Sequence, residues 1–350
     1  MAESNTKLYI AVGALVALGG ALFLQKRAAH QDDHAHSFEG QNESLPKLEL
    51  SEDLVKKVTK FTIEQPEKKG DSPKPGSTNT LVKEGETWKL AVPVTATANQ
   101  TNVESLLKNL PKLTVRERIA EGTAAYANYE LGDAEAIHFT AFEADKPVVE
   151  LWLGKSGGRG QTVRVKGKDG VYVLDGYSSF LYTRDTKGWR DLSILKLDTD
   201  KANRVTIDNE HGSFVFAKSG GAWMAEFKKA KGSAGKIKDF DTAKVDDLLR
   251  AYKTLNASDF GDGKTLADTG LEKPVATLGI TLDDGSKTEI LFGSTAEGSS
   301  RFAKLPGRDQ IYAISSWAAD WAVAEESKFV KKADSKAEPS APPMPGGLPP

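Results

Sequence analysis

The stretch Val148–Gly158, "VVELWLGKSGG", contains the residue types of two kinds of active site. Gly154-Lys155-Ser156 matches the end of a phosphate-binding loop, and the same glycine and serine with Gly158 fit the G-x-S-x-G pattern of a serine nucleophile. The phosphate loop also needs a glycine where the chain has Val149. Both patterns need a helix directly afterwards, but the next residues, "RGQTVRV", predict a strand. We therefore assign no catalytic residue here, and a serine hydrolase using Ser156 remains a weaker alternative.

A second group with chemical potential is "HQDDHAH", which holds three of the five histidines beside two aspartates. Imidazoles and carboxylates are common ligands of divalent transition metals, so His30, His34 and His36 are candidate ligands. Nothing in the surrounding polar sequence would hold these side chains in place, which favours a soluble spacer over a metal site. We assign no metal and no cofactor.

Composition excludes several other classes. The chain has no cysteine, which rules out disulfides, thiolate metal sites and a cysteine nucleophile. Its net charge of −2 gives no reason to expect a nucleic-acid partner. The two remaining histidines, His138 and His211, do not indicate a Ser/His/Asp arrangement, although its members need not be close in sequence.

The N-terminal region predicts a membrane anchor. After a short segment over residues 1–7, Leu8–Leu24 is a run of roughly 17 uncharged, mostly apolar residues, near the lower limit for a transmembrane helix. A cleaved signal peptide is the alternative, because Gly19 and Ala21 could precede a cleavage site. Lys7 on one side and Lys26 and Arg27 on the other leave the orientation open. Residues 25–56 are predicted to be a flexible spacer, and the Pro-rich residues 330–350 a disordered tail.

Between these ends the chain repeats one pattern twice. A tryptophan-led segment precedes an amphipathic helix in each half, with apolar residues at positions i, i+3, i+4 and i+7. The matching positions are Val103, Leu106, Leu107 and Leu110 in the first half and Val245, Leu248, Leu249 and Tyr252 in the second. Thr101 with Glu104 as a capping box, and Asp241 as an N-cap, predict where the helices begin. Pro111 predicts the end of the first helix.

The strands of the two halves also correspond. "KFTIEQ" (60–65) matches "RVTIDN" (204–209), and two hairpins are predicted in each half with a short helix after them. The predicted hairpins cover residues 136–153 and 162–174 in the first half, and 275–292 and 300–314 in the second. The predicted closing helices lie near 177–182 and 316–323, and 71–79 is predicted to be an extra loop. The fold class is therefore α+β, as two tandem repeats over 57–191 and 192–329, each a mainly antiparallel sheet covered by an amphipathic helix.

The repeat changes the interpretation of the glycines and tryptophans. Gly154 has a counterpart in Gly293, although the residues after it differ, and a tight turn at the end of a strand would explain both. The tryptophans at matching places or beside the closing segments are predicted to pack in the core, with sugar stacking or a partner surface as the alternative. They are Trp88, Trp189, Trp223, Trp317 and Trp321.

These patterns resemble the bacterial domain of unknown function 4340 family. The similarity lies in the anchor, "ETWKLAVP", "NVESLLKNL", "ELWLGK", "GVYVLDGYSSFL" and above all "GWRDLSILKLDTDKANRVTI". It covers most of residues 57–329 and includes no catalytic motif. The resemblance implies a membrane-anchored, extracytoplasmic protein, often encoded beside ABC-type exporters, including those linked to gliding motility.

The leading hypothesis is therefore a single-pass protein of the bacterial inner membrane with a periplasmic soluble part. It would act as a scaffold or interaction protein accessory to an ABC-type transport system, with transporter subunits as partners and no enzymatic activity of its own. The alternatives are a periplasmic module that binds glycan or peptide, the Ser156 hydrolase, and metal capture by the spacer histidines.

Overall fold

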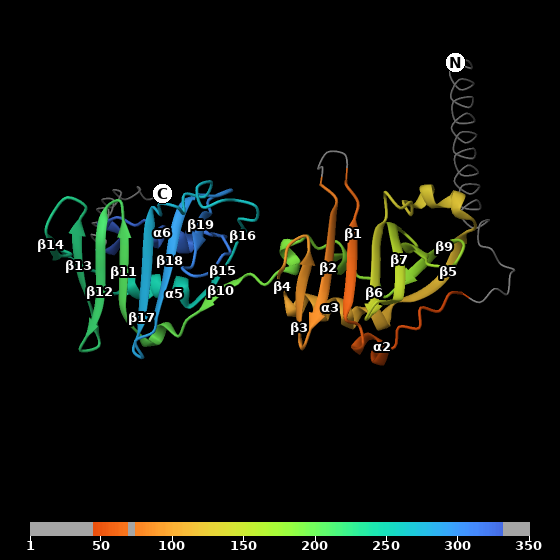
Figure 1. Ribbon diagram of the computed structural model, residues 1–350, viewed down its shortest axis with the longest axis horizontal. Coiled ribbons are helices and arrows are strands. Elements are labelled where there is room, and N and C mark those ends of the chain that lie inside the picture. The colour runs from red at the N-terminus through yellow and green to blue at the C-terminus, as the bar shows by residue number, and fades with distance from the viewer. Residues whose placement is uncertain (1–44, 69–73, 332–350) are drawn as a thin grey trace, which may run out of the picture. The chain divides into compact units, whose positions relative to one another are not determined.

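The computed structural model describes residues 45–68 and 74–331 (Figure 1). They divide into two compact units, with the boundary along the chain between Asp191 and Leu192. The expected anchor at 8–24, the spacer histidines and residues 332–350 lie outside the described part. Within that part, none of the helices combines the length and apolar character that crossing a membrane requires.

The first unit is built on a nine-stranded sheet in which all neighbouring strands are antiparallel. Its order is β4-β3-β2-β1-β6-β7-β8-β9-β5, so the first strand lies inside the sheet, next to the central β6, and β5 crosses to the far edge. The strands are β1 (Lys60–Gln65), β2 (Ser77–Glu84), β3 (Thr87–Val92), β4 (Ala96–Thr97), β5 (Thr114–Ala120), β6 (Ile137–Glu143), β7 (Lys146–Gly157), β8 (Gly160–Val165) and β9 (Val171–Asp175).

The second unit has a nine-stranded antiparallel sheet of its own and a small two-stranded ribbon. The order of the large sheet, β14-β13-β12-β11-β17-β18-β19-β20-β16, is that of the first sheet strand for strand. Its strands are β11 (Ala202–Asn209), β12 (Gly212–Ser219), β13 (Ala222–Lys229), β14 (Ala234–Lys236), β16 (Asp259–Phe260), β17 (Ala276–Leu282), β18 (Lys287–Thr295), β19 (Arg301–Lys304) and β20 (Tyr312–Ile314), and the ribbon pairs β10 (Ser193–Lys196) with β15 (Thr254–Asn256). The predicted α+β class with mainly antiparallel sheets is confirmed, as are the predicted hairpins.

One helix packs against one face of each sheet, as the apolar periodicity predicts. In the first unit α3 (Gln100–Asn109) places Val103 and Leu106 in a core that also contains Phe61 and Ile63 of β1. In the second unit α5 (Ala243–Lys253) does the same with the corresponding residues. Burial alternates along the strands (β13 reads exposed, buried, exposed, buried), because one face meets the helix and the other faces outward.

Each unit is closed by a short helix, α4 (Ser179–Tyr182) or α6 (Ser316–Ala322), held by the last residue of the first strand. Gln65 donates from Nε2 to the carbonyls of Tyr182 and Arg184 at 3.2 and 2.7 Å. Asn209 donates in the same way to the carbonyls of Ala322 and Ala324, both at 3.0 Å. An amide side chain at this strand end therefore fastens the closing segment in both units.

Buried tyrosines add a second link between helix and closing segment. The Tyr182 hydroxyl donates to Asn109 Oδ1 at 3.1 Å, and the Tyr252 hydroxyl donates to the Ala318 carbonyl at 2.8 Å. Burial raises the pKa of both tyrosines well above the usual range, so both remain neutral donors.

The structure corrects two predicted boundaries. The spacer predicted over 25–56 is too long, because Leu50 and Val55 are buried in the first core and α2 (Glu52–Lys56) lies within this stretch. Its Ser51 N-cap accepts from the Leu54 amide at 3.2 Å. The extra loop predicted over 71–79 is also too long, since β2 begins at Ser77.

The predicted helix starts are partly wrong. The first helix is capped by Asn99, whose side chain accepts from the Asn102 amide at 3.1 Å, and not by Thr101. Glu104, assigned to a capping box, instead pairs with Lys108 at 3.0 Å. Asn99 and Thr101, two residues apart, are both suitable cap types, and the pattern alone did not choose between them. In the second unit the N-cap position is Thr242, one residue after the predicted Asp241. The Asp241 carboxylate nevertheless accepts from the Ala243 amide at 3.1 Å.

The interpretation of Gly154 and Gly293 as turn residues is wrong. Both lie inside strands, β7 and β18, and neither has a positive φ. A Cβ on Gly154 would overlap the carbonyl oxygen of Tyr129, and one on Gly293 would overlap that of Thr269. These glycines are required because a loop backbone crosses directly over the sheet there.

We predict that Gly154→Ala and Gly293→Ala each destabilise their own unit by about 3 kcal/mol or more, because the added methyl would force a backbone carbonyl away from the sheet. Gly157→Ala, where a Cβ meets open space, is the matched control and should change stability by less than about 0.5 kcal/mol. Hydrogen exchange resolved to individual strands measures the two units separately. Equal protection in all three variants would contradict the close approach.

Candidate functional site

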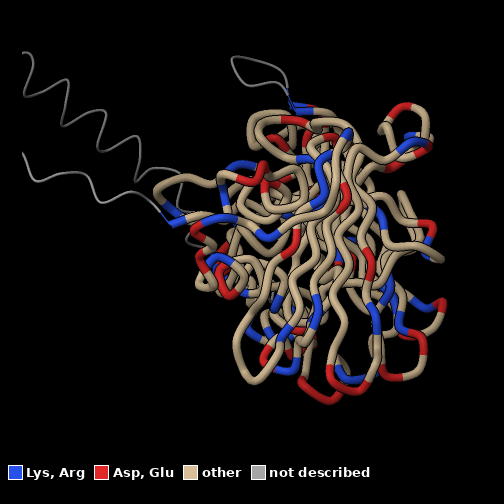
Figure 2. Tube along the Cα trace, turned by 90° about the vertical axis from the view of Figure 1, so that its left-hand side faces the viewer, with Lys and Arg blue, Asp and Glu red and all other residues tan. Residues whose placement is uncertain are grey.

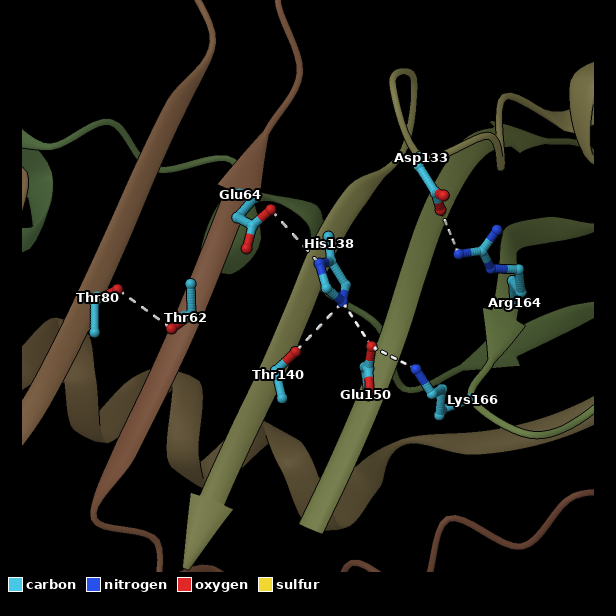
Figure 3. A network of polar contacts seen from close by, with 9 residues as sticks. All are labelled: Thr62, Glu64, Thr80, Asp133, His138, Thr140, Glu150, Arg164 and Lys166. Atoms are coloured by element: carbon cyan, nitrogen blue, oxygen red, sulfur yellow. Dashed lines mark hydrogen bonds and ion pairs between the residues drawn. The ribbon is translucent and has the colours of Figure 1, made fainter. Parts of the chain in front are cut away.

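The open face of the first sheet carries a cross-strand network centred on His138 (Figure 3). His138 Nε2 lies 3.1 Å from Glu150 Oε1 and 3.4 Å from Thr140 Oγ1, and its Nδ1 lies 3.6 Å from Glu64 Oε2. Lys166 Nζ approaches the same Glu150 oxygen at 3.4 Å. The imidazole thus joins carboxylates from β1 and β7, and the same Glu150 oxygen contacts both His138 and Lys166.

Beside this network three side chains lie next to one another across three strands. His138, Trp152 and Arg164 are register partners on β6, β7 and β8. The His138 and Trp152 rings stack with centroids 4.5 Å apart and planes 7° apart, and Arg164 Cζ lies 3.7 Å from the Trp152 centroid. Arg164 also pairs with Asp133 at 2.6 Å. Trp152 is only 8 % exposed, so stacking inside the protein occupies a ring that a sugar would need.

The loop that crosses the sheet at Gly154 borders this site. Its Tyr126 and Leu131 pack with Trp152 and Val171 in a small core on the outer face. The corresponding loop of the second unit packs Leu271 against Phe302 and Ile311. The two loops are also alike in detail, because Leu131 donates to the Tyr126 carbonyl at 2.9 Å, as Leu271 does to that of Leu266 at 2.8 Å.

The second unit has different side chains on the same scaffold. By strand register the counterparts of His138, Trp152 and Arg164 are Thr277, Leu291 and Lys304. Near Thr277 the surface is hollowed into a cleft of about 640 Å³, which the apolar Val275 and Val323 line together with charged Asp208, Lys273 and Arg301. The fold therefore does not require the His138 network. The outer-face position that the His138 imidazole occupies in the first unit borders a cleft in the second.

Ser156, the candidate nucleophile, has an amide partner. Its Oγ donates to Gln161 Oε1 at 2.5 Å, while Gln161 Nε2 donates to the Gly154 carbonyl at 2.6 Å. His138 is engaged by the network described above, and His211 Nε2 lies 3.8 Å from Glu210 Oε1. The contacts of Ser156 thus support a role in fixing the β7–β8 hairpin, and the hydrolase remains the weaker alternative.

The candidate metal ligands His30, His34 and His36 lie outside the described residues. Among residues 45–68 and 74–331, no group of three His, Asp or Glu side chains is placed to hold a metal ion. Charged residues of both signs are interspersed along the trace, many of them at turns (Figure 2).

The most exposed aromatic side chains stand at equivalent places in the two units. Ser178-Ser179-Phe180 opens α4 and Ser315-Ser316-Trp317 opens α6, each directly after the last strands of its sheet. Phe180 is 62 % exposed and Trp317 is 61 % exposed. Core packing was predicted for Trp317, which is wrong. The other tryptophans of that prediction, Trp88, Trp189, Trp223 and Trp321, are buried as expected.

These features define a class: an α+β protein of two units, each with an open antiparallel sheet face and an exposed aromatic ring on its closing helix. The family described as "Domain of unknown function (DUF4340)" matches residues 88–274 and 262–340, so the chain belongs to that family and the resemblance is confirmed. No curated protein and no solved structure matches the chain.

We predict that Glu150→Gln lowers the stability of the first unit by about 1 kcal/mol, because it weakens the contacts to both His138 and Lys166 at a carboxylate only 17 % exposed. Glu289→Gln, at the corresponding position of β18, is the control. Its 36 % exposed carboxylate pairs with Lys287 at 2.9 Å, and the change should stay within about 0.5 kcal/mol. Exchange rates of β6 and β7 amides, compared with those of β17 and β18, give both values, and a larger effect for Glu289 would refute the assigned role.

Proposed function

We propose that this protein is a single-pass, membrane-anchored extracytoplasmic scaffold and interaction protein, accessory to an ABC-type transport system of the cell envelope. Its partners are integral subunits of the transporter. The proposal includes a tandem origin of the two units, supported by their identical strand order and by the matching contacts of Gln65 and Asn209.

The observation that carries the interaction role is the pair Phe180 and Trp317. Both rings are more than half exposed, so the folded protein does not gain the stability that burying them would contribute. Both rings nevertheless occupy the same place after a Ser-Ser pair, while their neighbours Leu181 and Ala318 are buried. Exposed aromatic residues on a rigid element are typical anchors of protein interfaces.

Anchoring supports the same function. The apolar run at 8–24 would confine the folded units to the membrane plane, which raises their effective concentration near an integral partner. Placement beside an ABC-type exporter rests on the resemblance to the family, whose members are often encoded next to such systems.

The second candidate function is a periplasmic module that binds glycan or peptide. The cleft of about 640 Å³ on the second sheet favours it, because apolar Pro274 and Val275 lie there beside charged groups of both signs. Thermal shifts with cell-wall glycan fragments and short peptides distinguish this candidate. A shift that Val275→Asp abolishes would favour it over the interaction role.

We expect the full-length protein, solubilised from membranes and captured by affinity purification, to bring down subunits of an ABC-type transporter. Phe180→Ser and Trp317→Ser should each reduce this recovery at least about tenfold, because each removes an anchor without emptying the core. Met224→Ser, which removes a 49 % exposed apolar side chain elsewhere, is the control and should leave recovery unchanged. Transporter recovery that the double aromatic variant retains would overturn the role of these rings.

The topology has its own test. A reporter that is active only outside the cytoplasm, fused after Pro350, should be active, and the fusion should sediment with membranes. Deleting residues 8–24 should release it from them, because the remaining chain lacks the proposed anchor. An inactive reporter on a stable, membrane-bound fusion would place the folded units in the cytoplasm and contradict the proposal.

A further inference from the structure

A second cleft of the second unit lies on the helix side of its sheet. It has a volume of about 310 Å³ and is lined by Trp223 of β13, Lys218 of β12, one side of α5 and the short 3-10 turn before β11. The α5 residues in its wall are Asp246, Leu249, Arg250 and Lys253, and the turn contributes Thr199 and Asp200.

Side-chain contacts link the β12–β13 hairpin, α5 and the 3-10 turn that form the walls of this cleft. Trp223 Nε1 donates to Asp246 Oδ1 at 3.2 Å, which ties the β12–β13 hairpin to α5. Lys218 Nζ lies 5.7 Å from the centroid of the Trp223 ring, and Lys253 Nζ lies 3.3 Å from Asp200 Oδ2. A ligand would meet a fixed indole and preplaced charges, so little ordering would be needed on binding.

The charges in the cleft favour one anionic group. Three cations, Lys218, Arg250 and Lys253, face two carboxylates. Asp200 is paired with Lys253, and Asp246 accepts from the indole. Arg250 pairs through Nη1 with Asp247, which does not line the cleft, so Lys218 and the other guanidinium N–H groups of Arg250 are the donors that can receive a carboxylate. A single carboxylate matches this excess of one positive charge, whereas two carboxylates in the wall would repel a phosphate dianion.

The first unit offers an internal comparison. Its K-x-G-x-x-W hairpin has Lys83 and Trp88 at the places of Lys218 and Trp223, as strand register shows. Its helix, however, pairs Lys108 with Glu104 at 3.0 Å, and Pro111 stands at the position of Lys253. In the second unit Arg250 pairs instead with Asp247, which does not line the cleft, at 2.9 Å. The scaffold thus places a lysine beside a tryptophan twice, but the cationic cleft belongs to the second unit.

We propose that this cleft binds a glutamate or aspartate side chain of an acidic peptide segment in a protein partner. Lys218 and Arg250 hold the carboxylate, and the methylene groups of the ligand pack on Trp223 and Leu249. The inference extends the proposed function by naming the chemistry of the partner. Its test uses peptides and no transporter, so either proposal can fail while the other stands.

The experiment is a titration of the full-length protein in detergent, containing 5-fluorotryptophan, followed by ¹⁹F NMR. The probe is acetyl-Gly-Leu-Glu-Leu-Gly-amide, and the same peptide with Gln in place of Glu is the ligand control. Trp223→Phe assigns the resonance. We expect the Glu peptide to shift the Trp223 resonance in a saturable way with one site per chain, and the Gln peptide to bind at least about tenfold more weakly.

Lys218→Gln and Arg250→Gln should each weaken binding of the Glu peptide about tenfold. Both side chains lie on the surface, and the unchanged resonances of the other tryptophans would show that the variants fold. Lys236→Gln removes one charge from an exposed residue outside the cleft and should leave binding unchanged. Equal binding of the two peptides, unaltered binding by both cleft variants, or tighter binding of glutarate or inorganic phosphate than of the Glu peptide would overturn the proposal.

Discussion

The close approach of a loop carbonyl to a glycine in the middle of the sheet determines how each unit is built. Tyr129 lies over Gly154, and Thr269 lies over Gly293, so that a side chain of any size on the strand would lift the loop. Because the loop lies flat, its leucine reaches the outer face and forms a small second core there. One end of the outer face is thereby covered, and the rest remains open to solvent beside it.

The two units share one strand order but differ in side chains on their outer faces. Stacked His138, Trp152 and Arg164 lie on the outer face of the first unit, whereas in the second the smaller Thr277, at the position of His138, borders a cleft. A polar network across four strands stiffens a surface, while a cleft with apolar and charged walls offers a ligand a place. The two outer faces therefore suit different tasks although their strands follow the same order.

Much of the fold could be predicted because periodicity reports burial. The i, i+3, i+4, i+7 pattern predicted both covering helices, and the likeness of "KFTIEQ" and "RVTIDN" predicted that β1 and β11 correspond. What could not be predicted depends on contacts between residues far apart in sequence. Gly154 needs no special φ, so only the position of Tyr129 explains it, and His138 gains its role from Glu64 and Glu150 on neighbouring strands. Trp317 was misassigned because a tryptophan beside apolar residues has the same local pattern whether it faces in or out. Its match with Phe180 after a Ser-Ser pair was the available clue.

The surface residues on which both proposals depend lie on well-packed elements, but they contribute little to the hydrophobic cores. Phe180 and Trp317 extend from helices whose neighbouring residues are buried, so the rings are held in place without contributing to either core. Lys218 and Arg250 likewise stand on a hairpin and a helix that Trp223 and Asp246 fasten together. A group held rigidly at the surface loses little conformational entropy when a partner covers it, so more of the contact free energy appears as affinity. The proposed interaction role requires exposed groups on such supported elements. Phe180 in the first unit and Trp317, Lys218 and Arg250 in the second all lie on them.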